Sequence, residues 1–280
     1  MRCAGSKRRG AAIAVVLIAF VVTIGSTQLM AQSQGFPKPL TVSQIPREFL
    51  GTWKSINPRG ESNCGSLRDH YGNPRELCEF PVDKLEKVLN GRARAWIEFF
   101  DEPLSPKWDC VAAGIQTVMQ EGYLWRLSSR PDALIQEHEQ SNWIREIWMD
   151  GRAHPPATDI FYHGHSIGRM EGDKGLVIET TNFTFDPDGW DDHSHIATST
   201  RKKLTERYKL TGPDTMEIEF TVEDEIFLKE PFTWSHRYQK TNQAFISQWD
   251  CDNDAGYKEL YGTIPQRYPD DTTPAKYVEP

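Results

Sequence analysis

The chain has 280 residues, of which 40 are acidic and 32 basic, so its formal net charge is −8. An acidic surface repels phosphate backbones and anionic lipid headgroups, which argues against nucleic acid and membrane surfaces as partners. A small neutral or cationic molecule is the ligand class that this charge leaves open.

Residues 1–31 have the pattern of a signal peptide. Four basic residues precede an apolar run at 11–24, and a small residue, Ala31, ends the segment. A run of about 14 residues is short for a bilayer, which needs about 20. We expect cleavage after Ala31, a periplasmic or secreted protein and no stable membrane insertion afterwards, with an uncleaved N-terminal anchor as the alternative. Cleavage removes four basic residues and no acidic ones, so the net charge would change from −8 to −12.

The remainder of the chain predicts a single domain. We expect an extended lead-in at 32–47, one β-barrel domain at 48–262 and a C-terminal tail at 263–280. Its four cysteines are Cys64, Cys78, Cys110 and Cys251. An even number in an oxidising compartment favours two disulfides, and we prefer Cys64–Cys78 with Cys110–Cys251. The other pairings stay open, as does a four-thiolate zinc site, although no Cys-x-x-Cys pair occurs.

Short apolar segments separated by Gly, Pro, Asp and Asn indicate strands at the spacing of a sandwich or barrel. The predicted strands are residues 122–127, 134–140, 143–149, 164–170, 176–182, 203–210, 215–222 and 232–239. Residues 215–222 alternate strictly, which is typical of a strand with one buried face. Only residues 82–88 have helical texture, so we expect one or two short helices at most.

The turns predict antiparallel neighbours. Asp150-Gly151 directly follows one strand, residues 171–173 separate two others, and residues 212–214 precede the next. Such a meander must close on itself or pack on a second sheet to hide its edges. A closed barrel of this size leaves room for one small ligand.

Several motifs lie in the middle of the chain. They read EIWMDGRAHP at 146–155, HSIGRMEGD at 165–173, VIETTNF at 177–183, LTERY at 204–208 and TVED at 221–224. Together they resemble a large, mostly uncharacterised family of secreted bacterial proteins, over about residues 115–240. The resemblance implies an all-β, lipocalin-like (calycin-type) antiparallel barrel of about eight strands, with short helices and irregular tails, and implies no particular reaction. Met170 stands where many members have Trp.

Histidines gather in the same region. His163 and His165 are two residues apart, as are His193 and His195, so each pair would point to one side of a strand. Imidazoles give and take protons near neutral pH, and a nearby carboxylate orients the ring. The predicted catalytic residues are His165 and His195 as proton carriers, with Asp150 and Glu206 orienting the rings or sharing the proton.

A substrate site is predicted around these residues. Arg152 would hold a substrate oxygen with its fork of N–H donors, although a structural ion pair with Asp150 explains the same spacing. The other predicted substrate-binding residues are His154, Tyr162, Trp148 and Trp190. The chain has more aromatic surface than a minimal core needs, so part of it could stack on a flat apolar ligand.

Two other interpretations of the histidines remain open. They could cap strand ends or face water, or the two His-x-His pairs, His163, His165, His193 and His195, could bind zinc or copper. We expect no metal or other cofactor.

The sequence as a whole favours an exported enzyme of cofactor-independent acid–base chemistry, a lyase (dehydratase) or isomerase, acting on a small, partly apolar organic molecule. The alternative is a non-catalytic ligand-binding protein with the same pocket. An enzyme needs a base within hydrogen-bond reach of a substrate atom, whereas a carrier needs only apolar walls. The oligomeric state cannot be predicted.

Overall fold

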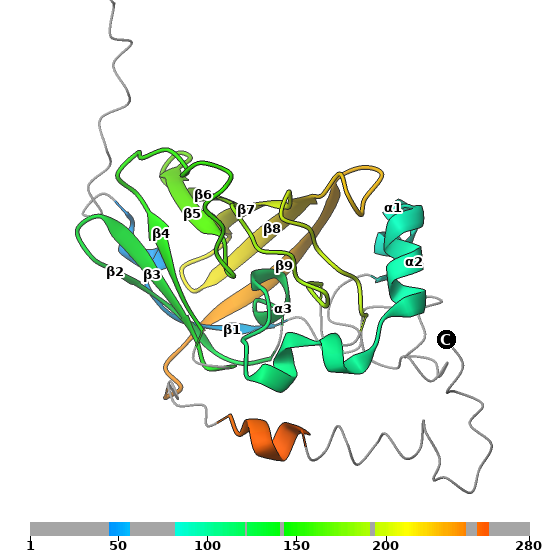
Figure 1. Ribbon diagram of the computed structural model, residues 1–280. Coiled ribbons are helices and arrows are strands. Elements are labelled where there is room, and N and C mark those ends of the chain that lie inside the picture. The colour runs from blue at the N-terminus through cyan, green and yellow to red at the C-terminus, as the bar shows by residue number, and fades with distance from the viewer. Residues whose placement is uncertain are drawn as a thin grey trace, which may run out of the picture. The chain divides into compact units, whose positions relative to one another are not determined.

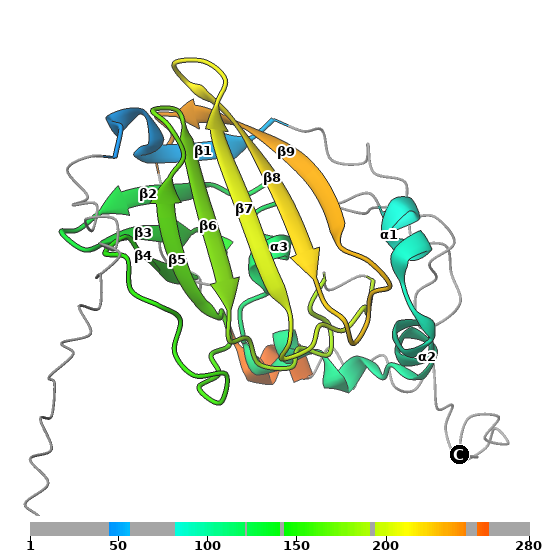
Figure 2. The same cartoon turned by 90° about the horizontal axis from the view of Figure 1, so that it is seen from above.

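The computed structural model describes residues 45–56, 82–120, 122–140, 143–190, 194–244 and 251–257. These all lie within Phe36–Pro280, one of the two units into which the chain divides. Nine strands form a closed barrel in sequence order, and β9 pairs with β1 to complete it (Figures 1 and 2). The strands are β1 (Gly51–Ser55), β2 (Trp125–Ser129), β3 (Ala133–His138), β4 (Ile144–Trp148), β5 (His165–Met170), β6 (Gly175–Thr181), β7 (Lys203–Leu210), β8 (Thr215–Glu223) and β9 (Phe232–Thr241). The all-β barrel expected from the sequence is therefore confirmed, with nine strands in place of about eight.

One pair of neighbours, β4 and β5, runs parallel, whereas every other pair is antiparallel. Strand direction can alternate around a ring only when the number of strands is even, so a barrel of nine must contain a parallel pair. The prediction of a tight antiparallel turn at Asp150-Gly151 is wrong for this reason. The chain has to return along the barrel before β5 can start, and residues 149–164 form that long connection.

All eight predicted strands are present, and the ninth, β1, was not predicted. Its sequence, GTWKS, has one fully buried side chain, Trp53, so it carries no alternation that a pattern could detect. β1 pairs with β2 on one side and with β9 on the other. This short strand therefore closes the barrel.

The barrel interior is filled by alternate side chains of its strands. In β8 the inward residues are Met216, Ile218, Phe220 and Val222, as its strict alternation predicts. Trp53 and Trp125 stack inside the barrel from neighbouring strands, with ring centroids 6.1 Å apart. A small barrel of this kind is a packed core rather than an open channel.

Most of the helices within the described residues lie in the connection from β1 to β2. They are α1 (Val82–Val88), α2 (Gly91–Phe99), the 3-10 turns η3 (Glu102–Leu104) and η4 (Pro106–Asp109), and α3 (Ile115–Val118); a further turn, η2 (Arg47–Phe49), precedes β1. All four residues of α3 are buried, and Tyr238 in β9 donates its hydroxyl hydrogen to the carbonyl oxygen of Met119 just after it. α3 therefore lies against the barrel interior, as both views show (Figures 1 and 2).

The helix predicted at residues 82–88 is confirmed, but the expectation of one or two helices at most is wrong. α2 buries one residue, Ala93, so its sequence shows no helical period. Its N-terminus is instead fixed by Asn90, whose side-chain oxygen accepts hydrogen bonds from the backbone N–H groups of Arg92 and Ala93. Within the described ranges, no helix is both long and apolar enough to cross a membrane.

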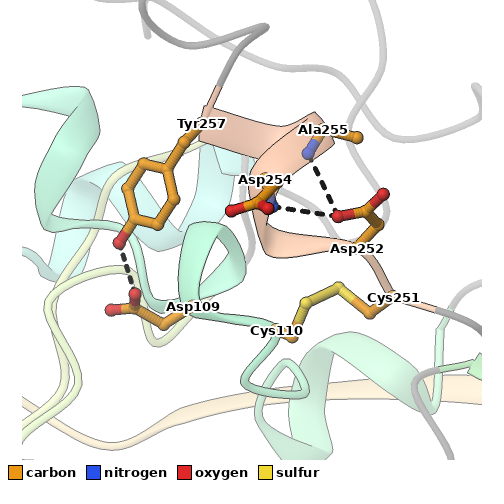
Figure 3. The surroundings of a disulfide bond; sticks show 7 residues. All are labelled: Asp109, Cys110, Cys251, Asp252, Asp254, Ala255 and Tyr257. Atoms are coloured by element: carbon orange, nitrogen blue, oxygen red, sulfur yellow. Dashed lines mark hydrogen bonds between the residues drawn. A yellow bond between two sulfur atoms is a disulfide. The ribbon is translucent and has the colours of Figure 1, made fainter.

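A disulfide joins Cys110 to Cys251, with Cα atoms 5.8 Å apart (Figure 3). It ties the segment after β9 to the end of η4, as predicted. Nearby, the hydroxyl of Tyr257 donates to the carboxylate of Asp109. The predicted partners Cys64 and Cys78 lie outside the described residues, as do the predicted signal peptide, nearly all of the lead-in and the C-terminal tail.

Candidate functional site

A pocket of about 370 Å³ opens where β4 and β5 meet. Two residue pairs hold this parallel ladder, Ile147 with Ser166 and Trp148 with Ile167. The lining residues are Ile144, Arg145, Glu146, Trp148, Arg152, Phe161, His163, Gly164, His165 and Ser166. Some of them lie on the outer face of the wall and others, such as the buried Arg145 and Ser166, on the inner face. The short seam therefore places the inward-facing Arg145 and Ser166 at the back of a pocket that opens on the outer wall.

The connection at 149–164 is anchored by Asn182, which follows β6 in the left-handed conformation. Its side-chain amide donates to the carbonyl oxygens of Pro156 and Asp159, both at 2.9 Å. The backbone N–H of Phe161 in turn donates to the carbonyl oxygen of Asn182 at 2.8 Å. One buried residue thus places the whole connection over the pocket.

Gly164 lets the chain turn into β5 with no side chain in the way. Its φ is +69°, and a Cβ here would lie 2.7 Å from the carbonyl oxygen of Thr181. A larger residue would therefore have to push the connection away from β6. The glycine keeps His163 and His165, on either side of it, at the same pocket.

His165 is coupled to His154 and through it to Glu179. The Nδ1 atoms of the two histidines are 3.0 Å apart, so one proton lies between them. His154 Nε2 is 3.5 Å from Oε1 of Glu179, too far for a hydrogen bond in this geometry, but the negative charge of the carboxylate favours a proton on Nε2. Neutral His154 then accepts at Nδ1 from His165. His165 is left with an unprotonated Nε2, which is a base.

His163 has the opposite arrangement. The indole Nε1 of Trp143 lies 2.6 Å from His163 Nδ1, and an indole N–H only donates. Nδ1 of His163 is therefore the accepting nitrogen, and the neutral ring carries its proton on Nε2. The pocket thus holds one imidazole that accepts a proton and one that donates a hydrogen bond.

Both rings are neutral at pH 7. Burial, with the positive charges of Arg145 and Lys202, lowers the pKa of His163 to about 4. Burial also lowers the pKa of His165, and His154 and Arg152 add to this effect. The pKa of His154 is lowered by burial too, which outweighs the opposite effect of Glu179.

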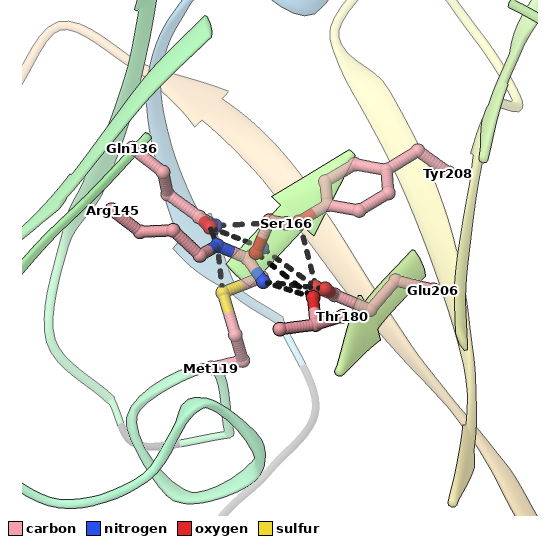
Figure 4. Close-up of polar contacts among 7 residues, drawn as sticks. All are labelled: Met119, Gln136, Arg145, Ser166, Thr180, Glu206 and Tyr208. Carbon is pink, nitrogen blue, oxygen red and sulfur yellow. Dashed lines mark hydrogen bonds and ion pairs between the residues drawn. The ribbon is translucent and has the colours of Figure 1, made fainter. Parts of the chain in front are cut away.

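The inner end of the pocket is Arg145, whose guanidinium is enclosed by a polar cluster inside the barrel (Figure 4). Two of its nitrogens donate to the carboxylate of Glu206 at 2.7 and 3.0 Å, and two donate to Oε1 of Gln136 at 3.0 and 2.6 Å. Tyr208 also donates to Glu206, at 3.1 Å. Glu206, predicted to share a proton with a histidine, is instead the counter-charge of Arg145.

At the outer side of the pocket, Arg152 lies flat on the indole of Trp148, with Cζ 3.5 Å from the ring centroid. Its Nε donates to the carboxylate of Asp150 at 2.9 Å, and Nη2 donates to the same group. The guanidinium of Arg152 lowers the pKa of Asp150. Asp150 thus holds Arg152 rather than a histidine, although Arg152 and Trp148 do line the pocket as predicted.

The other predicted residues lie in different surroundings. His195 stacks on Phe100, with ring centroids 4.1 Å apart, and its Nδ1 lies 3.3 Å from a carboxylate oxygen of Asp188. Trp190 is fully buried and packs against aromatic side chains of β9. Tyr162 donates its hydroxyl hydrogen to Asp186 at 3.3 Å, and burial raises its pKa.

The four histidines considered as metal ligands do not form one group in the described part of the chain. His163 and His165 share the pocket, His195 lies with Asp188, and His193 is outside the described residues. No cluster of three or more His, Cys, Asp or Glu side chains suited to a metal ion occurs among the residues that the structure describes.

Three contributors to the site were missed by sequence reasoning. Trp143 and Arg145 lie in WIREIW, residues 143–148, where apolar and polar residues come in pairs rather than alternately, so the sequence could not say which face each would take. Glu179 lies on the outer face of β6, where an acidic residue ordinarily only meets solvent, but it also reaches His154. The signal that could have found Glu179 is its place two residues before Thr181, the partner of His165 across the hairpin.

Comparisons with known protein families, curated proteins and solved structures find no match to this chain. The resemblance of its motifs to a family of secreted bacterial proteins therefore stays a prediction.

Proposed function

We propose that the protein is an enzyme that moves a proton on a small carbonyl compound, as an isomerase or a lyase, without a cofactor. The observation that carries this proposal is the pairing of His165 and His163 at one pocket, the first with an accepting Nε2 and the second with a donating Nε2–H. A base and a neutral hydrogen-bond donor within reach of the same bound molecule are the groups that enolisation needs.

In the proposed reaction His165 Nε2 takes a proton from the carbon next to the carbonyl group. The electrons of the broken C–H bond form a C=C bond, and those of the C=O bond move to oxygen. His163 Nε2–H stabilises that developing oxyanion. In a β,γ-unsaturated ketone, the C=O bond re-forms as the proton returns to the γ carbon, so the C=C bond moves next to the carbonyl group. In a β-hydroxy ketone, the C=O bond re-forms as the C–O bond to the hydroxyl group breaks, and the proton leaves with that hydroxyl as water. Both outcomes balance without an oxidant or reductant.

The depressed pKa of each histidine supports these roles. A base must be unprotonated before it reacts, and burial keeps His165 so at neutral pH. A neutral imidazole is a weak acid, so His163 donates a hydrogen bond without losing its proton to the substrate. The pocket volume of about 370 Å³ lies at the small end of the range for ligand sites, roughly 300–1,000 Å³.

Exchange of protons next to a carbonyl tests the proposal without knowledge of the natural substrate. The purified protein is mixed with acetophenone in D₂O, and loss of the methyl signal is followed by proton NMR. We expect exchange faster than in buffer, and a loss of about 10²- to 10⁴-fold in His165→Gln, whose amide can keep the contact with His154. Lys209→Gln, exposed on β7 and not among the lining residues of this pocket, is the control and keeps the rate. Exchange that is no faster than in buffer contradicts the proposal.

A non-catalytic carrier is the second candidate, favoured by the apolar mouth of the pocket. Ile144 is 58% exposed and Phe161 45% exposed, and both line it. A carrier would bind acetophenone and leave its methyl protons in place. The same experiment therefore separates the two candidates.

We also infer that the protein works outside the cytoplasm, in the periplasm or secreted. The Cys110–Cys251 disulfide supports this, since such bonds persist in oxidising compartments. The N-terminal pattern adds a signal peptide. Sequencing the N-terminus of protein from the periplasmic fraction tests the inference: a start at Gln32 is expected, and an intact N-terminus in the cytoplasm contradicts it.

A further inference from the structure

The pocket contains two arginines, and each is already matched to its own carboxylate. Arg145 pairs with Glu206 at 2.7 Å, in the barrel interior where both side chains are at most 2% exposed. Arg152 pairs with Asp150 at 2.5 Å, at the outer side. The third charged lining residue, Glu146, contacts Arg130. The charge of the pocket is therefore balanced before a ligand arrives.

The hydrogen-bond donors of Arg145 are used as completely as its charge. A guanidinium has five N–H groups, and four of them point to Gln136 and Glu206. The fifth faces the hydroxyl oxygen of Thr180 at 3.5 Å. A ligand carboxylate reaching Arg145 would have to displace one of these partners.

Arg152 is matched in charge too, although its side chain is 37% exposed and only Nε and Nη2 reach a carboxylate. Nε and Nη2 both point to Asp150, and the flat face of the guanidinium covers the indole of Trp148. A carboxylate entering the pocket would lose water without gaining an unmatched cation, which is unfavourable. An uncharged carbonyl oxygen needs only the N–H of His163, and the exposed side chains of Ile144 and Phe161 favour an apolar ring or chain beside it.

We propose that this pocket selects an uncharged carbonyl compound with an apolar body, and that Asp150 sets the selectivity by neutralising Arg152. This rests on the proposed function for the carbonyl group, whereas the charge selectivity follows from the ion pairs alone. Asp150 thereby becomes a specificity-determining residue in place of the catalytic residue that the sequence predicted.

Asp150→Asn is the variant that tests this, because it frees Arg152 without disturbing the core. The two side chains are 32% and 37% exposed, so their ion pair adds little to folding. Asp173→Asn removes the same charge from the hairpin between β5 and β6, outside the pocket, and is the matched control. Glu206→Gln is less suitable, since it would leave a buried arginine without its counter-charge.

Binding is measured by ¹H–¹⁵N NMR titration with acetophenone and with 4-acetylbenzoate, which differ by one carboxylate. The unmodified protein is expected to bind acetophenone more tightly, by about tenfold. Asp150→Asn should tighten binding of 4-acetylbenzoate by about tenfold and leave acetophenone nearly unchanged, since a freed guanidinium forms charge-assisted hydrogen bonds. Asp173→Asn should keep the original ratio.

Equal or tighter binding of 4-acetylbenzoate by the unmodified protein overturns this selectivity. So does a protein that binds neither ketone, or an Asp150→Asn variant in which the ratio of the two affinities is unchanged. The result is separate from the test of catalysis, because binding needs no turnover. Selective binding without proton exchange would overturn the proposed reaction and leave the selectivity standing. Proton exchange combined with equal affinity for both ketones would overturn the selectivity and leave the proposed reaction standing.

Discussion

Trp143 donates its indole hydrogen to Nδ1 of His163 across 2.6 Å, and so determines which nitrogen of that ring carries the proton. Trp143 is 1% exposed and lies directly before β4. Its ring also lies 5.6 Å from the guanidinium carbon of Arg145. Trp143 therefore fixes the position and the tautomer of the His163 ring through its Nδ1 atom.

Trp143→Phe keeps an aromatic ring but removes the donor, so His163 can adopt either tautomer. We expect the rate of proton exchange to fall by about tenfold, because the net free energy of one hydrogen bond corresponds to about that factor. The ¹⁵N shifts of His163 should move toward a mixture of tautomers. Trp96→Phe, whose indole binds the carbonyl oxygen of Pro187, is the control. An unchanged rate and unchanged shifts in Trp143→Phe would show that Trp143 only fills space.

Glu179→Gln is expected to reverse the relay behind His165. Lys203 Nζ contacts Oε2 of Glu179 at 2.5 Å, so in the variant it would hold the amide oxygen and turn the NH₂ group toward His154. His154 Nε2 must then accept, its proton moves to Nδ1, and His165 is left with a proton on Nε2. Nε2 of His165 thus changes from a base to a hydrogen-bond donor.

The expected loss of exchange in Glu179→Gln is about 10²-fold, with the fold retained because the side chain is 31% exposed. Glu171→Gln, also on the barrel surface, is the control for the same chemical change. The ¹⁵N spectrum of His165 supplies a second measurement. A variant that lost activity with His165 in its original tautomer would contradict the relay.

The pH profile of exchange should have an acid limb below the ordinary histidine value of about 6.5. Protonation of His165 removes the base, so activity falls as pH falls, and burial moves that loss to lower pH because it lowers the pKa of His165. kcat/KM is measured from pH 4 to 8 under constant ionic strength. A midpoint at or above about 6.5 would contradict a buried, neutral base.

The Arg145–Glu206 pair predicts a double-mutant signature in stability. Removing the carboxylate alone, in Glu206→Leu, leaves a buried guanidinium and should destabilise the fold by about 3–5 kcal/mol. Replacing both, in Arg145→Met with Glu206→Leu, should recover part of that loss, because no buried charge remains. Urea unfolding measures both. If the double variant is less stable than Glu206→Leu, the pair is not the source of the effect.

The fold was largely predictable because most strands carry their own local signal. β8 alternates strictly, and the segments of β2 to β9 are bounded by turn residues. β1 and the parallel β4–β5 pair were not predictable in this way. The first is a strand of five residues, and the second follows from the number of strands in the ring, which no local pattern contains.

The candidate site was predictable only in part. The motif region placed His154, His163 and His165 close together, and the structure assembles all three at the seam. His195 and Glu206 were assigned to the same site because of their residue types, but their partners, Asp188 and Arg145, are set by contacts distant in sequence. The tautomers that distinguish base from donor depend on Trp143 and Glu179, whose contacts likewise cross between strands.

A long-range ¹H–¹⁵N NMR spectrum of the histidine side chains of the unmodified protein at pH 7 tests the base and the donor of the pocket most directly. Single variants assign the signals of His163 and His165. Two neutral rings of opposite tautomer are expected, with the proton on Nε2 of His163 and on Nδ1 of His165. Two rings of the same tautomer, or a positively charged ring in either position, would contradict it.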